Sequence, residues 1–352
     1  MSPRVRVVMP CINAERYLRA AAASILEQSY ADFELLVVDD GSDDATLSIL
    51  EEFAGTDSRV RVESRPHAGI VAALNHGLAV ARGELIARMD ADDVSLPRRL
   101  QRQVTFLDQH PEVAAVGSWM REIDAGGVAT RVLRKVPAER RSRESTGVPI
   151  FHPTAMIRRT ALEAVGGYRP AFEAAEDADL WFRMLDHGFV LENVEEILVE
   201  YRIHNGNVSL LTERQTVALT RALLSRRARW SGVDDYLGDA SITLPAGTVP
   251  WNLFPPQVTG PVRVELARRL SLLNRESDPE PLAAAIPSAI DEVGFVSGLR
   301  KPAGQLSRRY RAAGRRRQAL LWSLASLVCG LRDRAVRAAR SGARWMLRRR
   351  AR

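Results

Sequence analysis

Strand-like and helix-like segments alternate along the first 120 residues. Short apolar runs predict buried strands, and apolar positions spaced three and four residues apart predict helices between them. The predicted strands are 4–10, 34–38, 59–64, 85–89 and 114–119. The predicted helices are 14–28, 43–53, 70–81 and 96–110. This alternation is typical of an α/β fold built on βαβ units.

The pattern is less regular in the rest of the chain. The polar stretch 124–147 is expected to be mobile, and order returns with an apolar segment at 151–158. Two short strands are predicted at 190–194 and 197–203. Helices are predicted at 176–187 and 213–230. Residues 231–298 are rich in proline and have no clear periodicity, so no role is assigned to them.

Composition fits a soluble globular protein in a reducing compartment. Of the 352 residues, 46% are hydrophobic and 26% are charged. Cys11 and Cys329 are the two cysteines, and their wide spacing indicates neither a disulfide framework nor a zinc site. A strand-like run follows directly after Met1, so no signal peptide is expected, and we expect a cytoplasmic protein.

The charge is divided unevenly along the chain. Residues 299–352 hold 17 basic residues and the single acid Asp333, a net +16, which leaves −9 of the total +7 for residues 1–298. Within this tail, 318–331 is an uncharged segment of 14 residues, too short to span a bilayer, which needs about 20. Arginines on both sides of it favour a helix lying on an anionic membrane surface. The alternative is a basic helix that packs its apolar face on the acidic body.

The most informative segment is an acidic cluster after the fourth predicted strand. Asp90, Asp92 and Asp93 lie within four residues, directly after the apolar run 85–87. Ligands of open α/β sheets bind at the carboxyl edge of the strands, and a divalent cation that also touches phosphate oxygens would relieve the repulsion between these carboxylates. The alternative is an acidic turn that caps a helix beginning at Leu96.

Further polar residues lie at predicted turns and helix starts. Asp39 and Asp40 end the second strand, at the edge where Asp90 is expected. Glu176 and Asp177 open a helix, where acids are also ordinary partners of the helix dipole. Gly166 and Gly167 allow close approach of backbone to a ligand, or form a plain turn. His204 is a candidate metal ligand or an ordinary polar residue. The glycine patterns of dinucleotide-binding and P-loop proteins are absent from the sequence.

In order along the chain, these motifs resemble family 2 glycosyltransferases with the GT-A fold, most closely bacterial members that build lipopolysaccharide, capsule and exopolysaccharide. The resemblance extends from about residue 5 to 209. Its motifs are 8–13 (Val-Met-Pro-Cys-Ile-Asn), 36–42 (Leu-Val-Val-Asp-Asp-Gly-Ser), 75–77 with 81–84, 90–93 (Asp-Ala-Asp-Asp), 152–154, 166–168, 176–181 and 201–204.

The resemblance implies a mixed Rossmann-like sheet flanked by helices and a role for each matched residue. Asp90 and Asp92 would bind Mn²⁺ or Mg²⁺, with His204 close to the metal and the diphosphate. Asp177 would be the catalytic base with Glu176 beside it, and Pro10 and Asp40 would contact the nucleotide base. The whole nucleotide-sugar set comprises Pro10, Cys11, Asn13, Glu15, Asp39, Asp40, Asn75, Asp90, Ala91, Gly166 and Gly167.

The implied reaction is an inverting transfer of one sugar from a nucleoside diphosphate sugar, most commonly a UDP-sugar, to a glycan or lipid-linked acceptor. One base on the acceptor hydroxyl and one cation at the leaving diphosphate suffice for it. Two residues depart from the family pattern. Cys11-Ile12 replaces the usual aromatic after the proline, and His67 stands where asparagine is frequent. The signature Gln-x-x-Arg-Trp of processive synthases is absent after Asp177, which favours a single transfer.

The expected domains are a glycosyltransferase domain at 1–210, an extension of unknown role at 211–298 and a basic helical tail at 299–352. Within the first, 1–120 would bind the nucleotide and 121–210 would hold the acceptor and the catalytic base. Two other functions fit parts of the sequence. One is an inactive sugar-nucleotide-binding protein, which the retained Asp177, Asp92 and His204 argue against. The other is nucleic-acid binding through the tail, for which no recognisable module exists.

Overall fold

The computed structural model describes residues 2–135, 148–204 and 213–238, together with Leu253 and Val262. Compact packing divides the chain into two units, Met1–Ala222 with Ala240–Thr243, and Leu223–Asp239 with Leu244–Arg352. Every strand of the described residues and every predicted site residue belongs to the first unit. Among the described helices, none combines the length and the apolar character needed to cross a membrane.

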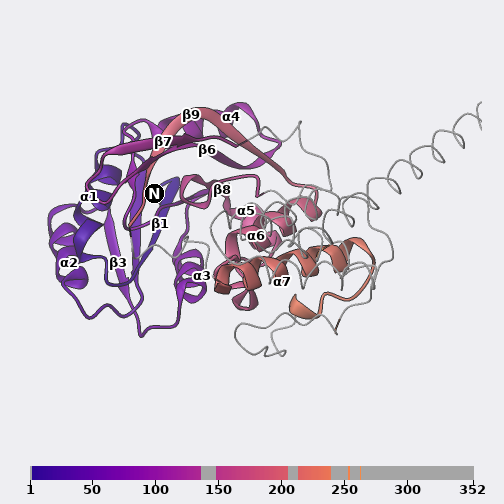
Figure 1. Cartoon of the computed structure of the whole chain (residues 1–352). Coiled ribbons are helices and arrows are strands. Elements are labelled where there is room, and N and C mark those ends of the chain that lie inside the picture. Colours follow the sequence, from indigo (N-terminus) through magenta and orange to yellow (C-terminus); the bar gives the residue numbers. More distant parts are fainter. Residues whose placement is uncertain (1, 136–147, 205–212, 239–252, 254–261, 263–352) are drawn as a thin grey trace, which may run out of the picture. The chain divides into compact units, whose positions relative to one another are not determined.

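The first unit is built on one mixed sheet (Figure 1). Its strands are β1 (Val5–Cys11), β2 (Phe33–Asp39), β3 (Val60–Ser64), β4 (Leu85–Arg88), β5 (Val94–Ser95), β6 (Val113–Ile123), β7 (Ala129–Leu133), β8 (Met156–Arg158) and β9 (Val190–Arg202). Their order is β3-β2-β1-β4-β8-β6-β9-β5, and β7 pairs with β6. The strands from β3 to β4 are parallel, whereas β8 runs antiparallel to both of its neighbours.

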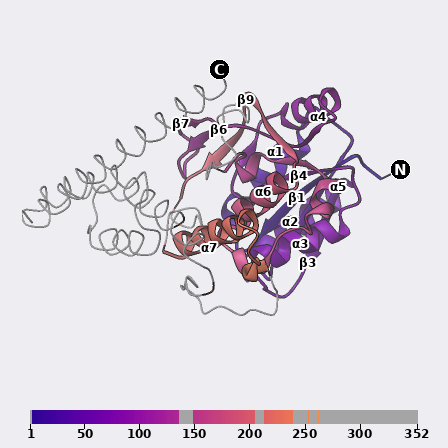
Figure 2. The same cartoon turned by 90° about the vertical axis from the view of Figure 1, so that its right-hand side faces the viewer.

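Helices cover both faces of the sheet. They are α1 (Glu15–Leu26), α2 (Thr46–Thr56), α3 (Ile70–Val80), α4 (Arg99–Gln109), α5 (Arg159–Ala164) and α6 (Glu176–Asp186). In Figure 1, α1 and α2 lie on one side of β1 and β3, and α3 lies on the other. Figure 2 views the sheet from the side of α3, α5 and α6.

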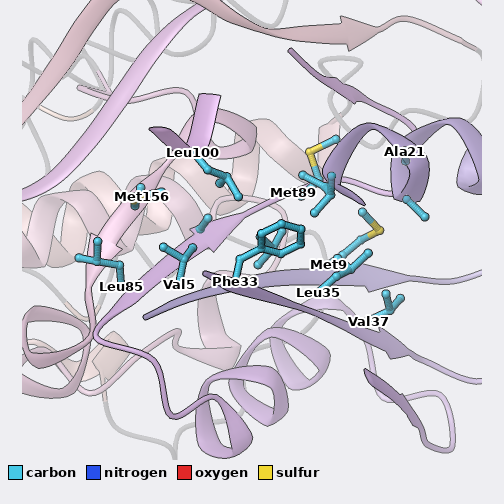
Figure 3. Close-up of a cluster of buried hydrophobic side chains, with 14 of the residues drawn as sticks. Val5, Met9, Ala21, Phe33, Leu35, Val37, Leu85, Met89, Leu100 and Met156 are labelled. Carbon is cyan, nitrogen blue, oxygen red and sulfur yellow. The ribbon is translucent and has the colours of Figure 1, made fainter. Parts of the chain in front are cut away.

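The alternation of side chains along the strands explains the two layers. Val5, Val7 and Met9 of β1 face the cluster that α1, α2 and α4 complete, while Val8 faces the cluster on α3, α5 and α6. Figure 3 shows the first cluster, with Phe33 and Leu35 of β2 beside Met9. Because successive strand residues point to opposite faces, strands buried on both faces have continuous apolar runs rather than alternating ones.

The predicted α/β alternation is confirmed, with corrections after residue 90. The helix expected from Leu96 begins at Arg99, after Pro97, and no side chain caps it. Gln28 Oε1 instead accepts a hydrogen bond from Leu100 N–H at 3.0 Å. The helix-cap interpretation of the acidic cluster is therefore wrong. The two-residue strand β5 was not predicted, because so short a pairing has no sequence period of its own.

The two strands expected at 190–194 and 197–203 are one strand, β9. Pairing with β6 passes from Val194 opposite Ser118 to Ile197 opposite Trp119, so Glu195 and Glu196 bulge from the ladder. These two acids interrupt the apolar pattern without ending the strand.

The expectation of a mobile segment at 124–147 is wrong for Ala129–Leu133, which forms β7. The pairing with β6 supplies backbone hydrogen bonds that a pattern of polar residues does not reveal. Residues 136–147 lie outside the described residues.

Less of the second unit is described. The predicted helix at 213–230 is confirmed as α7 (Glu213–Trp230), which crosses the boundary between the units and is followed by the short 3₁₀ helix η4 (Tyr236–Gly238). Ser225 Oγ donates to Asp235 Oδ2 at 2.6 Å, and Arg229 pairs with the same carboxylate. Most of 239–298 and all of the predicted basic tail, 299–352, lie outside the described residues.

Candidate active site

The carboxyl ends of β1 and β2 bring the first group of predicted residues together. Cys11 is in register with Asp39, and Asp40 N–H donates to Cys11 O at 2.9 Å. The buried Asp39 carboxylate accepts hydrogen bonds from the hydroxyls of Ser42 and Ser64. Burial raises the pKa of the Cys11 thiol to about 12, so it remains neutral and packs as a small apolar side chain.

Asp40 organises the turn that follows β3. Its carboxylate accepts hydrogen bonds from Ala68 N–H (3.1 Å) and Gly69 N–H (2.8 Å), and it lies 2.8 Å from Nδ1 of His67. His67 thus occupies the family's usual asparagine position as a direct partner of Asp40. In this structure the Asp40 oxygens are bound by the chain itself, and the His67 side chain is 63% exposed beside them.

Asn13 and Glu15 connect the start of α1 to the loop before α2. Asn13 Oδ1 accepts from Asp43 N–H, and Asn13 N–H donates to Ser42 Oγ. Glu15 Oε2 accepts from Ala45 N–H at 3.0 Å, while the Glu15 N–H donates to Asp44. Both predicted nucleotide-sugar residues therefore fix the shape of the edge on which Pro10 and Asp39 lie.

The acidic cluster forms a tight turn between β4 and β5. Asp90, Asp92 and Asp93 each offer an oxygen, and these oxygens lie within 4.8 Å of one another. Asp90 and Asp92 are partly exposed, whereas Asp93 is fully buried. Met89 N–H donates to Val8 O at 3.2 Å, so the turn leaves the sheet beside β1.

Arg88, Arg202 and His204 contact this turn. The buried Arg88 forms an ion pair with Asp90, and Nε2 of His204 lies 2.9 Å from Oδ2 of Asp92. Arg202 Nε donates to the Asp92 carbonyl oxygen at 2.9 Å, and Arg202 N–H donates to Asp93 Oδ1 at 2.8 Å. The end of β9 is thereby bound to the acidic turn.

Two carboxyl groups of the turn, those of Asp92 and Asp93, have raised pKa values. Burial and the neighbouring Asp90 raise the pKa of Asp92. Burial, Asp90 and Asp92 hold the pKa of Asp93 well above its usual range. Such crowding of like charges in a partly buried site is relieved by a cation.

The residues fit a divalent metal ion. The oxygens of the turn are hard ligands of the kind that Mg²⁺ and Mn²⁺ prefer. Asp93 Oδ2 is buried and makes no hydrogen bond to any described residue, so its environment leaves one acceptor without a partner. Asp90, Asp92 and His204, the predicted metal set, are brought together here, and Asp93 joins them.

Glu176 and Asp177 lie at the start of α6. Burial and the neighbouring Asp177 raise the pKa of Glu176 to about 7, and burial raises the pKa of the half-buried Asp177. The positive charge of Arg88 acts on both carboxylates and on Asp92, so one buried cation is common to the acidic turn and this pair. A carboxylate with a raised pKa is a stronger general base.

The glycine turn ends α5. Gly166 and Gly167 have φ angles of +74° and +66°, and Gly167 N–H donates back to Leu162 O at 3.0 Å. The Asn75 amide holds this turn, since it accepts from Tyr168 N–H (2.9 Å) and donates to Tyr168 O (2.8 Å). A Cβ on Gly167 would lie 2.9 Å from Asn75 Oδ1, whereas one on Gly166 would meet open space.

Asn75 and Gly167 also line a hollow of about 360 Å³ between α3 and α5. None of the acidic residues discussed above lines it. The hollow is therefore not the place where the carboxylates meet.

A buried polar pair joins His152 to Tyr168, the residue that follows the glycine turn. Nε2 of His152 is 2.8 Å from the Tyr168 hydroxyl, and its ring lies edge-on to Trp181. Burial and Arg88 lower the pKa of His152 well below its usual range, so the imidazole is neutral. His152 is thus a packed polar residue of the buried interior.

Three residues of the site were not predicted from the sequence. Arg88 is the charged last residue of an otherwise apolar strand. A charged residue at the end of a buried strand could have indicated a role at the site. Arg202 lies within a matched motif but carried no assigned role. Tyr17 falls within the helix predicted at 14–28, where its spacing fits the apolar face, although its ring centroid lies 4.9 Å from that of His204.

Comparison with known proteins places the chain among glycosyltransferases. The model of the family Glycosyl transferase family 2 matches residues 6–166. EpsE of Bacillus subtilis, whose name assigns it to the glycosyltransferases, is 36% identical over 231 residues, covering 64% of this chain and 82% of EpsE. The O-antigen biosynthesis glycosyltransferase WbnJ of Escherichia coli is 32% identical over 205 residues, covering 57% of this chain and 80% of WbnJ.

Solved structures agree on the fold. S. aureus TarS in complex with UDP superposes with a TM-score of 0.56 at 17% identity, covering 90% of this chain and 89% of that one. The mannosyltransferase PcManGT of Pyrobaculum calidifontis, in complex with GDP-Man and Mn²⁺, has a TM-score of 0.52 at 19% identity, covering 93% and 88%. The predicted GT-A fold is confirmed, and with relatives as similar as EpsE and WbnJ the chain belongs to glycosyltransferase family 2.

Proposed function

We propose that this glycosyltransferase moves a single sugar from a nucleoside diphosphate sugar, with a UDP-sugar as the first candidate, to a glycan or lipid-linked acceptor with inversion. The observation that carries the proposal is that two clusters of carboxylates, the acidic turn and the Glu176–Asp177 pair, both feel the charge of Arg88. The acidic turn offers three oxygens within 4.8 Å of one another, and the Glu176–Asp177 pair has raised pKa values. The first group suits a leaving diphosphate and the second suits a base.

Each residue of the site has a separate role in an inverting displacement. Asp177 takes the proton of the acceptor hydroxyl, and the oxygen of that hydroxyl bonds to the anomeric carbon. The bond from this carbon to the diphosphate breaks on the opposite face, and the nucleoside diphosphate leaves. Asp90, Asp92 and His204 would hold a divalent cation, which would supply Lewis-acid stabilisation of the leaving group. Because Asp177 acts as a base, no covalent glycosyl-enzyme is formed.

The relatives support the class of substrate and of pathway. WbnJ is named for O-antigen biosynthesis, and TuaG of Bacillus subtilis, 27% identical over 209 residues, is named for teichuronic acid biosynthesis. TarS has been solved with UDP-GlcNAc as well as UDP. We therefore assign this chain to cell-surface polysaccharide synthesis. We place it on the cytoplasmic face of the membrane, where lipid-linked acceptors are held and where the basic residues 299–352 would meet anionic lipid.

The proposal is tested by calorimetric titration of UDP, dTDP and GDP, each with Mn²⁺ and with EDTA. The wild type should bind one nucleotide in the presence of Mn²⁺ and lose most of that affinity in EDTA. Asp92→Ala should behave in Mn²⁺ as the wild type does in EDTA. Asp124→Ala is a matched control, since this acid lies outside the turn and its carboxylate accepts hydrogen bonds from Gly126 and Val128.

Either of two results would contradict the proposal. Nucleotide binding that is equally tight with Mn²⁺ and with EDTA would refute the proposed role of the metal. If none of the three nucleotides binds, the proposal that the donor is a nucleoside diphosphate sugar would be refuted.

A further inference from the structure

Tyr17 lies on the first turn of α1 and faces the end of β9. Its ring centroid is 4.9 Å from that of His204 at an interplanar angle of 43°, and the guanidinium carbon of Arg202 lies 4.7 Å from the same ring. These contacts join two segments that are far apart in the sequence. Both fall within the ranges for aromatic pairs and for cation–π contacts.

The Arg16 guanidinium carbon also lies 4.9 Å from the ring centroid of Tyr17. The other two residues that the ring contacts, His204 and Arg202, are those that bind the acidic turn. His204 lies 2.9 Å from the Asp92 carboxylate. Arg202 donates its Nε–H to Asp92 O and its backbone N–H to Asp93. The aromatic ring therefore supports both links between β9 and the turn, and it reaches the carboxylates only through them.

The ring face, and not the hydroxyl, makes these contacts. Tyr17 Oη is buried and forms no hydrogen bond to the described residues. Nor is Tyr17 among the side chains of the two large hydrophobic clusters that cover the faces of the sheet. Its contacts with His204 and Arg202 are thus directed at residues beside the acidic turn rather than at the apolar core.

We propose that Tyr17 is a positioning residue that holds His204 and Arg202 in place, so that the imidazole of His204 and the carboxylate of Asp92 keep the relative orientation needed to bind a divalent cation. The inference rests on the metal site of the proposed function. Residues that orient metal ligands change affinity by about 10- to 100-fold when they are replaced. A flat aromatic ring can fix the plane of an imidazole, which a flexible aliphatic side chain cannot.

The test measures binding of Mn²⁺ by the full chain in excess UDP, from the loss of the electron paramagnetic resonance signal of free Mn²⁺. Tyr17→Leu should weaken Mn²⁺ binding by about tenfold or more, whereas Tyr17→Phe should stay within about twofold of the wild type. Tyr17→Met, which keeps much of the apolar volume, replaces the leucine variant if the latter unfolds at the assay temperature. The control is Tyr30→Leu, another partly buried aromatic, which packs against the core and lies near Asp32 and Asp108. It should leave Mn²⁺ binding unchanged.

A double-mutant cycle with His204→Ala separates positioning from general destabilisation. If Tyr17 acts through His204, the loss in the double variant will be smaller than the product of the two single losses. Independent, multiplying losses would overturn the inference, and so would a Tyr17→Leu protein that binds Mn²⁺ as tightly as the wild type. A wild type that fails to bind Mn²⁺ with UDP would instead refute the metal site of the proposed function, and this inference with it.

Discussion

The pH dependence of the reaction is set by individual carboxyl groups at the start of α6. Burial raises the pKa of Glu176 to about 7 and raises that of Asp177. Because the base must be ionised to accept a proton, kcat/KM should rise with pH and level off above an apparent pKa near 7 that belongs to the pair. Asp177→Asn should lose about 10²- to 10⁴-fold on the high-pH plateau and less at low pH, where the wild-type base is already protonated. Initial rates between about pH 5.5 and 9 measure both effects. A flat profile in the wild type would contradict the assignment.

The raised pKa of Glu176 also lowers the free energy of unfolding at neutral and higher pH. The pKa of Glu176 is about 7 in the folded chain against 4.5 for an unperturbed glutamate, so between these values the folded state binds more protons than the unfolded state. Stability therefore falls as the pH rises through this window. Glu176→Gln should raise the free energy of unfolding at about pH 8 by about 1–3 kcal/mol and change it little at about pH 4.5. Urea unfolding at both pH values tests this, with the exposed Glu195→Gln as control.

At single positions, a residue could be predicted from the sequence when its side chain is unusual for its local structure, such as a carboxylate at the end of an apolar strand. A residue could not be predicted when its role depends on contacts with a segment far away in the sequence. Asp90 and Asp92 were predicted because adjacent carboxylates after an apolar strand are costly without a partner. Asn75 was assigned to the donor, but both polar atoms of its amide bind the backbone of Tyr168. Tyr17 fits a helix pattern equally well as a core residue, and its contacts with β9 depend on a fold that brings residues far apart in sequence together.

Between elements, a buried ion-pair cluster joins α6 to the glycine turn. Asp179 is fully buried and pairs with Arg169 and Arg183, while Arg183 donates to the carbonyl oxygens of Val165 and Gly167. Asp179→Ala leaves the buried Arg183 guanidinium without this carboxylate and removes the same partner from the partly buried Arg169. We therefore expect a loss of about 3–5 kcal/mol in the free energy of unfolding.

Denaturant unfolding of the Asp179→Ala protein measures this loss. Glu52→Ala, which removes an exposed ion pair with Arg19, should have little effect by comparison. A loss no larger than that of the control would show that the cluster does not hold α6 and the glycine turn together.

Elements were predicted well where one period extends over several residues. The strands β1 to β4 and the helices α1 to α3 agree with the predictions to within a few residues, because buried parallel strands and amphipathic helices differ clearly in apolar spacing. The errors concern β5, β7 and the interruption in β9. The strand β5 and the interruption in β9 depend on pairing with a strand distant in the sequence, which local spacing does not encode. The strand β7 pairs with its neighbour β6, but its residues lack the apolar alternation that marks a strand.

At the scale of the whole molecule, the uneven charge predicts where the protein resides. Residues 299–352 carry a net +16 and residues 1–298 a net −9. Each basic residue close to an anionic bilayer contributes about 1 kcal/mol of attraction, and this attraction weakens as salt shortens the screening length. The full chain should therefore sediment with vesicles that contain about 30% phosphatidylserine and stay in solution with purely phosphatidylcholine vesicles. Raising the salt to about 0.5 M should release much of the bound protein, while the uncharged, largely apolar sequence 318–331 should retain a fraction. Equal binding to both kinds of vesicle would exclude an electrostatic anchor. Absence of binding to either would favour a tail that packs on the acidic body instead.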